Sequence, residues 1–187
     1  MDKRKEILIN ALRDKEELIR KSAAEALEKL EIRARLDMLS KKIESGEMLE
    51  KARAVYALAD LKGPKVIELL AKAVKDPSED VRAATVRVLG TLGDVNALPL
   101  LVEALKDQSA IVVRATIEAL GNYRDSRLLG PLMQTLKNSD SGVVERALEL
   151  IGRFGDKRAE EAMTYFAIKG NVRMRSIALK ALGEMDR

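Results

Sequence analysis

The chain contains no histidine, no cysteine and no tryptophan, and aromatic residues make up only 3% of its 187 residues. Without histidine and cysteine it cannot build a Ser-His or Cys-His catalytic pair, and it has no imidazole or thiolate to bind a metal. The glycine-rich phosphate motifs GxGxxG and GxxxxGK are also absent. Carboxylates are common but scattered along expected solvent faces, where no neighbouring group would adjust them for acid–base catalysis. The sequence therefore predicts that the protein is not an enzyme and has no cofactor and no metal site.

Long apolar runs are missing as well. No stretch is long and apolar enough to span a membrane, and the start, MDKRKEILIN, lacks the apolar core of a secretory signal. The absence of cysteine fits a reducing compartment. These features predict a cytoplasmic protein with no membrane partner. The net charge of +4 is spread along the chain, which gives little support to nucleic-acid binding, because nucleic-acid binders usually gather their cations on one face.

The sequence does contain one pattern that returns every 31 residues. It is clearest in residues 81–94, and it combines a large apolar position with a small one four residues earlier. A period shared by both kinds of position is typical of a repeat protein, and six units account for nearly all of residues 1–187, which predicts a single repeat domain. The large positions are Leu27, Leu58, Leu89, Leu120, Ile151 and Leu182, and the small ones are Ala23, Ala54, Thr85, Thr116, Ala147 and Ala178. We call the large residues the landmarks of repeats one to six.

Each repeat has a second apolar register upstream of its landmark, with apolar side chains four residues apart. Two such segments per repeat predict a hairpin of two amphipathic helices, called A and B. The turns between A and B are expected at Ser45-Gly46, Asp76-Pro77, Asp107-Gln108, Asn138-Ser139 and Lys169-Gly170.

The joins between repeats are marked by glycine and aspartate. A left-handed closing residue suits glycine, which we expect of Gly90, Gly121, Gly152 and Gly183 and of Gly93 and Gly155. Asp94, Asp125 and Asp156 are placed to cap the next A helix, and Gly63-Pro64 marks the join before repeat three. Residues 30–36 contain no helix breaker, so the sequence favours a bent, nearly continuous helix there over a tight turn but leaves both open.

The period and several residues of repeat three resemble the short HEAT-like repeats of the phycocyanobilin lyase family. The residues that carry the resemblance are Val81-Arg82, Ala84, Leu89-Gly90, Gly93-Asp94, Ala97-Leu98 and Leu101. The resemblance covers all six units and implies an all-α fold, a right-handed superhelical α-solenoid of six two-helix HEAT-like repeats. It implies A helices on the convex face and B helices along the concave face. HEAT-like hydroxylases that hold iron with His-Glu motifs are excluded, since the chain has no histidine.

The resemblance also implies a ladder of hydrogen bonds between neighbouring repeats, formed by an aspartate and an arginine six residues apart. Asp14 with Arg20 and Asp76 with Arg82 have this spacing, and we interpret them as structural. Valine stands in the place of the cation in repeats four and five. That leaves Asp107 to a shifted partner such as Arg114, or to solvent.

Two surfaces are candidates for binding a partner. The first is the stripe of each B helix that faces away from the core, predicted to form a concave groove for an acidic or mixed-charge protein or peptide, because Tyr and Arg often carry interface energy. Its residues are Arg53, Tyr56, Arg87, Glu118, Asn122, Arg146, Glu149, Arg153 and Lys180. The alternative is a solvated face on which Arg146, Glu149 and Arg153 pair along one helix. The second surface is the last repeat, with Tyr165, Phe166, Met174 and Ile177 as possible contacts, or else as filling of a degraded terminal core.

The leading hypothesis is thus a non-enzymatic interaction scaffold that binds a protein or peptide along the concave face. A chromophore-handling protein similar to bilin lyases is the alternative suggested by the resemblance, although Tyr56 is the one aromatic residue expected in the groove. A HEAT-like nucleic-acid binder is less favoured, because Asp60, Glu118, Glu149 and Glu184 would face the phosphates with like charge.

Overall fold

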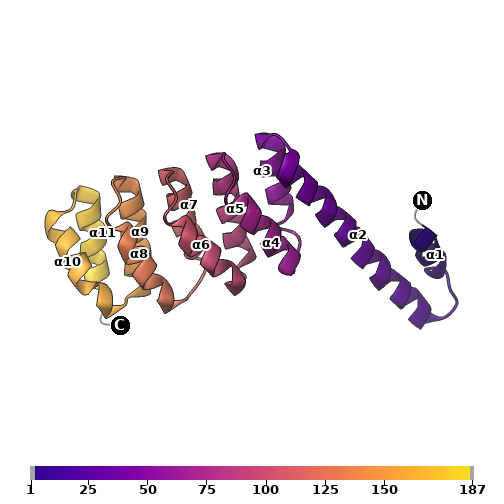
Figure 1. Cartoon of the computed structure of the whole chain (residues 1–187). Coiled ribbons are helices and arrows are strands. Elements are labelled where there is room, and N and C mark those ends of the chain that lie inside the picture. Colours follow the sequence, from indigo (N-terminus) through magenta and orange to yellow (C-terminus); the bar gives the residue numbers. More distant parts are fainter. Residues whose placement is uncertain (1–2, 186–187) are drawn as a thin grey trace.

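The computed structural model describes residues 3–185, and this part of the chain is helical without any strand (Figure 1). The α-helices are α1 (Lys3–Ala11), α2 (Glu17–Ser45), α3 (Met48–Ala57), α4 (Pro64–Ala73), α5 (Glu79–Leu92), α6 (Leu98–Ala104), α7 (Ala110–Leu120), α8 (Leu129–Thr135), α9 (Ser141–Phe154), α10 (Glu160–Lys169) and α11 (Val172–Leu182). Short 3₁₀ helices, η1 (Val95–Ala97), η2 (Ser126–Leu128) and η3 (Lys157–Ala159), precede α6, α8 and α10. None of these helices is long and apolar enough to cross a membrane.

The helices form hairpins stacked side by side, as the period predicts (Figure 1). Repeats three to six are α4/α5, α6/α7, α8/α9 and α10/α11, and repeat two is the second half of α2 with α3. The landmarks of repeats two to five are fully buried, and so are the small residues four positions before them. One core of aliphatic side chains runs through the stack. The predicted all-α solenoid of two-helix repeats is confirmed.

The B helices form the tighter row of the stack. Helices α3, α5, α7, α9 and α11 each pack on the next, whereas α4, α6 and α8 pack mainly on B helices. Closer spacing along one row bends a stack toward that row. This places the B helices on the concave side, as the resemblance implies.

Repeat one does not stack on repeat two. Helix α2 runs without interruption from Glu17 to Ser45, so the B helix of repeat one and the A helix of repeat two are one continuous helix. Of the two alternatives for this join, a turn or a nearly continuous helix, the structure has the continuous helix, in keeping with the absence of a helix breaker in residues 30–36. As a result α1 and the first half of α2 stand away from the stack, and we call them the arm (Figure 1).

The glycines at the joins have two different roles. Gly93 and Gly155 have positive φ angles of 60° and 63°, as expected of closing residues, and Gly63, with a φ of 112°, is the residue before the first turn of α4. Gly90, Gly121, Gly152 and Gly183 do not have positive φ angles, so their expected left-handed conformation is wrong. The absence of a side chain matters there for packing: a Cβ added at Gly90 would lie 2.6 Å from the Cβ of Ala119, and one at Gly152 would lie 2.8 Å from the Cβ of Ala181.

The aspartates at the joins cap helices as predicted. Asp94, Asp125 and Asp156 each accept a hydrogen bond of 2.9 Å from the backbone N–H two residues later. The capped element is in each case a 3₁₀ turn that leads into the A helix, rather than the A helix itself. Hydrogen bonds from Arg127 and Arg158 lower the pKa of Asp125 and Asp156 to about 2, so both caps stay ionised.

Candidate functional site

The predicted groove residues lie on consecutive B helices and face solvent. Only Glu149 is partly covered, and the others are exposed. Arg53 and Tyr56 lie on α3, Arg87 on α5, Glu118 on α7 with Asn122 just beyond its end, Arg146, Glu149 and Arg153 on α9, and Lys180 on α11. The structure therefore brings them to one row of helices, but it divides them into two chemically different groups.

The first group is held together by ion pairs. Arg146 on α9 contacts Glu118 on α7, with 3.4 Å between Nη2 and Oε1, and its Nη1 donates to Glu149 at 3.0 Å. Arg173 of the next repeat lies 3.6 Å from Glu149 and 3.1 Å from Glu145. The alternative of a solvated face predicted that Arg146 and Glu149 pair along one helix, and they do. In addition, Arg146 and Glu149 form ion pairs with residues of the neighbouring repeats. These charges are largely compensated within the molecule.

Asn122 and Arg153 tie neighbouring B helices together. The Nδ2 of Asn122 donates to the backbone oxygen of Gly90 at 3.1 Å, and the Nη2 of Arg153 donates to that of Gly121 at 3.2 Å. Both residues come two positions after a landmark, and both reach the glycine one position after the preceding landmark. Their structural role was not predicted, although the shared register could have indicated it.

The side chains of the second group have no polar partner in the part of the chain that the structure describes. The side chains of Arg53, Tyr56, Arg87 and Lys180 make no hydrogen bond or ion pair within residues 3–185, and Tyr56 is 50% exposed. Arg53 and Tyr56 belong to the B helix that packs directly against the helix of Arg87. The nearby carboxylate Asp60 is already paired with Arg35, at 3.6 Å. The N-terminal part of the concave face thus presents two uncompensated guanidinium groups and an aromatic ring.

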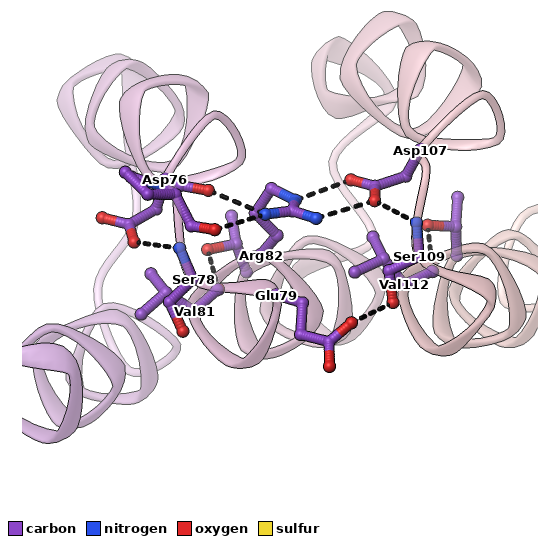
Figure 2. A network of polar contacts seen from close by, with 11 residues as sticks. Asp76, Ser78, Glu79, Val81, Arg82, Asp107, Ser109 and Val112 are labelled. Atoms are coloured by element: carbon purple, nitrogen blue, oxygen red, sulfur yellow. Dashed lines mark hydrogen bonds and ion pairs between the residues drawn. The ribbon is translucent and has the colours of Figure 1, made fainter.

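Arg82 lies at the centre of a network of hydrogen bonds that follows the expected ladder (Figure 2). Its Nη1 donates to the backbone oxygens of Asp76 and Pro77, at 2.9 and 3.0 Å. Its Nε and Nη2 donate to the two carboxylate oxygens of Asp107 in the next repeat, at 2.7 and 2.9 Å. Burial opposes ionisation of Asp107, but hydrogen bonds from Arg82 and from the Ser109 backbone hold its pKa below the usual range. The pair therefore stays charged and joins repeats three and four.

The rest of the ladder follows the same rule, in which a cation binds the aspartate of the following repeat. Lys51 binds Asp76 at 2.7 Å, and Arg114 binds Asp140 at 3.1 Å. Asp107 therefore pairs with Arg82, and the expected pairing of Asp107 with Arg114 is wrong. Arg114 stands one position beyond the usual cation site, yet its long side chain still reaches forward to the next repeat.

Repeat one contains half of a ladder contact. Arg20 donates to the backbone oxygens of Asp14 and Lys15 at 2.8 and 2.9 Å, just as Arg82 does in its own turn. The predicted association of Asp14 with Arg20 is thus made through the backbone oxygen of the aspartate. Since repeat two does not stack on repeat one, no carboxylate of a following repeat meets this guanidinium among the described residues.

Tyr123 forms a further tie between repeats three and four. Its buried hydroxyl donates to the backbone oxygen of Leu89 at 2.8 Å, and burial raises the pKa of Tyr123 to about 12. We expect Tyr123→Phe to lower the free energy of unfolding by about 1 kcal/mol, the net value of one such bond. Urea unfolding followed by circular dichroism measures this loss. An equal effect of Tyr165→Phe, whose ring is exposed, would show that the hydrogen bond is not its cause.

The last repeat differs from the expected docking surface. Met174 is buried, and Phe166 and Ile177 pack against the core, so the core-filling alternative holds for these three. Tyr165 is exposed and meets Phe166 edge-on, with 5.2 Å between the ring centres. The apolar side chains that do face solvent here with Tyr165 are Ile168, Val172 and Leu179.

Comparisons with known proteins agree with this geometry. Residues 36–121 match the family model of HEAT repeats, and no curated protein matches the sequence. Human deoxyhypusine hydroxylase has a TM-score of 0.63 and 21% identity, over 86% of this chain and 66% of the hydroxylase, so this chain spans slightly less than two thirds of it. At such identity the likeness concerns the fold.

Two further solved structures cover most of both chains. A designed armadillo repeat protein in complex with the peptide (KR)4 has a TM-score of 0.58 and 20% identity, over 98% of this chain and 100% of the designed one. The complex of CpcE and CpcF of phycocyanin lyase from Nostoc has a TM-score of 0.60 and 20% identity, over 79% of this chain and 98% of the matched one. Residues 36–121 are thus similar to HEAT repeats, and the likeness of the whole stack to these structures concerns the fold of stacked helical hairpins.

Proposed function

We propose that this protein is a non-enzymatic scaffold that binds an acidic or mixed-charge segment of another protein along the concave row of B helices. The observation that carries this proposal is the contrast within that row. Arg53, Tyr56 and Arg87 are exposed and uncommitted, whereas Arg146, Glu118 and Glu149 already satisfy one another. A partner segment would therefore be anchored on α3 and α5.

The chemistry of these side chains favours carboxylates. A guanidinium group donates two parallel hydrogen bonds to a carboxylate, and Tyr adds a large contact area at a low entropic cost. The designed armadillo protein in complex with (KR)4 is an example of a repeat stack that holds a peptide. That peptide is basic, whereas the free cations of this face favour an acidic one.

The alternatives have less support from the residues. A chromophore needs a stacking surface, and Tyr56 is the one aromatic side chain among the predicted groove residues. The chain has no histidine, so it cannot supply the His-Glu iron ligands of HEAT-like hydroxylases. Glu118 and Glu149 would oppose nucleic-acid phosphates. The scaffold proposal includes a cytoplasmic location and a single repeat domain over residues 1–187.

The first test uses short labelled peptides as probes. We expect (ED)4 to bind the protein and (KR)4 not to bind, in fluorescence anisotropy at low salt. The variant Arg53→Glu/Arg87→Glu should weaken the binding of (ED)4 by about tenfold or more, because each lost charge pair is replaced by repulsion. The control Lys106→Glu/Lys137→Glu makes the same change of net charge at exposed positions in the turns that follow α6 and α8.

Equal losses in the two variants would show that only net charge matters and would contradict the groove. Retention of (ED)4 by the Arg53→Glu/Arg87→Glu variant would do so as well. Affinity capture from the cells that make the protein, with the same two variants, then identifies the natural partner. We expect that partner to be captured by the wild type and the control but lost by the concave-face variant.

A further inference from the structure

Stacked repeats in this chain meet through a fixed set of B-helix positions. Gly90, one residue after its landmark, lies against Ala119, one residue before the next landmark, and Gly152 lies against Ala181 in the same way. On each of these B helices, the residues one and two helical turns before the glycine or the alanine also belong to the contact between the two helices. Between α5 and α7 the two faces are small and apolar, and all of their residues are buried. They are Gly90, Val86 and Ala83 on one side and Ala119, Ala115 and Val112 on the other.

Where the structure leaves two faces unstacked, the sequence places charges on them. The equivalent positions at the join between repeats one and two include Lys21 and Glu28 on the arm, and Glu50 and Arg53 on α3. All four side chains are exposed. The stacked joins on either side of α9 carry some charge at these positions as well, namely Arg114, Glu145 and Arg146, whereas the join between α5 and α7 carries none.

The two outermost faces resemble the uncharged join between α5 and α7. The repeat-six face, Gly183, Leu179 and Ser176, is exposed, with Leu179 58% accessible and the neighbouring Val172 85% accessible. The repeat-one face, Ala26, Ser22 and Ile19, is also largely open, with Ile19 43% accessible. Neither face carries a charge. Each has the composition of a covered face, with glycine on one side and alanine on the other at the position of closest approach.

The ladder of ion pairs is also incomplete at both ends of the chain, and the two incomplete ends are complementary in charge. The carboxylate of Asp14 accepts the N–H of Glu16, as Asp107 accepts that of Ser109, but no cation binds Asp14 among the described residues. Arg175 occupies the register position of Arg82, and within residues 3–185 its side chain donates one hydrogen bond, from Nε to the backbone oxygen of Ala167 at 3.3 Å. Repeat six thus has a ladder cation without an aspartate, and repeat one has a ladder aspartate without a cation.

From these faces and these ladder ends we propose that copies of the protein associate head to tail, the repeat-six face of one copy covering the repeat-one face of the next. Gly183 then lies opposite Ala26, and Arg175 binds Asp14, so the register of the stack continues across the junction. The repeat-one face is available to a second copy, since Ser22 and Ile19 on it are exposed. A contact of this type joins two different surfaces, so it produces chains or rings rather than closed dimers. One hairpin contact is smaller than a standard interface of roughly 1,600 Å², so the association is reversible and depends on concentration.

Sedimentation velocity of the whole chain over a wide concentration range tests the proposal. We expect the wild type to grow beyond a dimer as its concentration rises. Leu179→Glu and Ile19→Glu should each remain monomeric alone, and an equimolar mixture of them should form a one-to-one dimer, because each variant retains one intact face. The control Val95→Glu places the same charge at an exposed apolar residue of η1 and should associate like the wild type. Thermal melting by circular dichroism confirms that all variants are folded.

Charge reversal gives an independent measurement. Asp14→Arg and Arg175→Asp should each weaken association by about tenfold, and the double variant should restore it. A wild type that stays monomeric at all concentrations would overturn the proposal. A dimer that Leu179→Glu abolishes but Ile19→Glu preserves would show that two repeat-six faces meet, and a dimer that survives both changes would show an exchange of arms. Either result would also overturn it.

Discussion

Replacing Gly90 with leucine should lower the free energy of unfolding by about 3 kcal/mol, the upper end of the range for overpacking a core. Gly90 lies inside α5, and a Cβ there would come within 2.6 Å of the Cβ and 2.8 Å of the Cα of Ala119. The second of these atoms belongs to the backbone, so no change of rotamer can relieve the clash. The two helices must therefore separate at the centre of the stack. Chemical denaturation in urea measures the loss.

The control for this prediction is the same kind of change at a glycine with free space. Gly130 lies in α8, has no positive φ angle, and an added Cβ there would meet nothing within 4 Å. We expect Gly130→Ala to raise stability by about 0.5 kcal/mol, because alanine favours the helix and restricts the unfolded chain. Gly90→Ala should be destabilising. If both alanine variants were stabilising, close approach at Gly90 would not be a constraint.

The Gly90→Leu variant should also unfold less cooperatively. The stability of a repeat stack is the sum of the stabilities of its units and of the interfaces between them. Weakening one central interface lets the parts on either side unfold separately, which lowers the urea dependence of the transition or divides it in two. An unchanged urea dependence would show that the interface between α5 and α7 does not couple the two halves.

Removing Arg82 should cost about 3 kcal/mol, the lower end for breaking a buried ion pair. The residue is only 7% exposed, and Arg82→Met leaves Asp107 without its main partner and deletes two hydrogen bonds to the turn before α5. The double variant Arg82→Met/Asp107→Leu should be more stable than the sum of the single losses predicts, because it removes the unpaired charge. Strict additivity in this double-mutant cycle would contradict a direct coupling of the two side chains.

The ladder also predicts a dependence on acid. The folded pKa of Asp107 lies below its usual range, so its contribution to stability is fully present above its unfolded pKa of about 3.9 and is lost as the pH falls through the folded value. The caps Asp125 and Asp156, each with a pKa of about 2, act in the same direction. We expect stability to decrease from about pH 4 towards pH 2. Asp107→Asn should make this decrease shallower, and an unchanged slope would contradict the assignment.

Most of the fold could be predicted because it rests on local patterns. Leu89 and its equivalents recur with Thr85 and its equivalents, and this spacing places both kinds of side chain on the buried side of a helix. The aspartates after each B helix could be recognised because a cap needs only a side chain and an N–H group close to it in the sequence. The continuous α2 could be expected for a similarly local reason, since residues 30–36 contain nothing that ends a helix.

The sequence by itself thus determined the helices, their turns and the period of the stack, since each depends on residues within one or two helical turns. Only the tertiary structure decided which groups meet across repeats: Arg82 with Asp107, 25 residues away, and Arg146 with Glu118. Such pairs depend on the distance and rotation between neighbouring helices. Those are set by the volumes of packed residues such as Gly90 and Ala119, and the repeat period alone does not specify them.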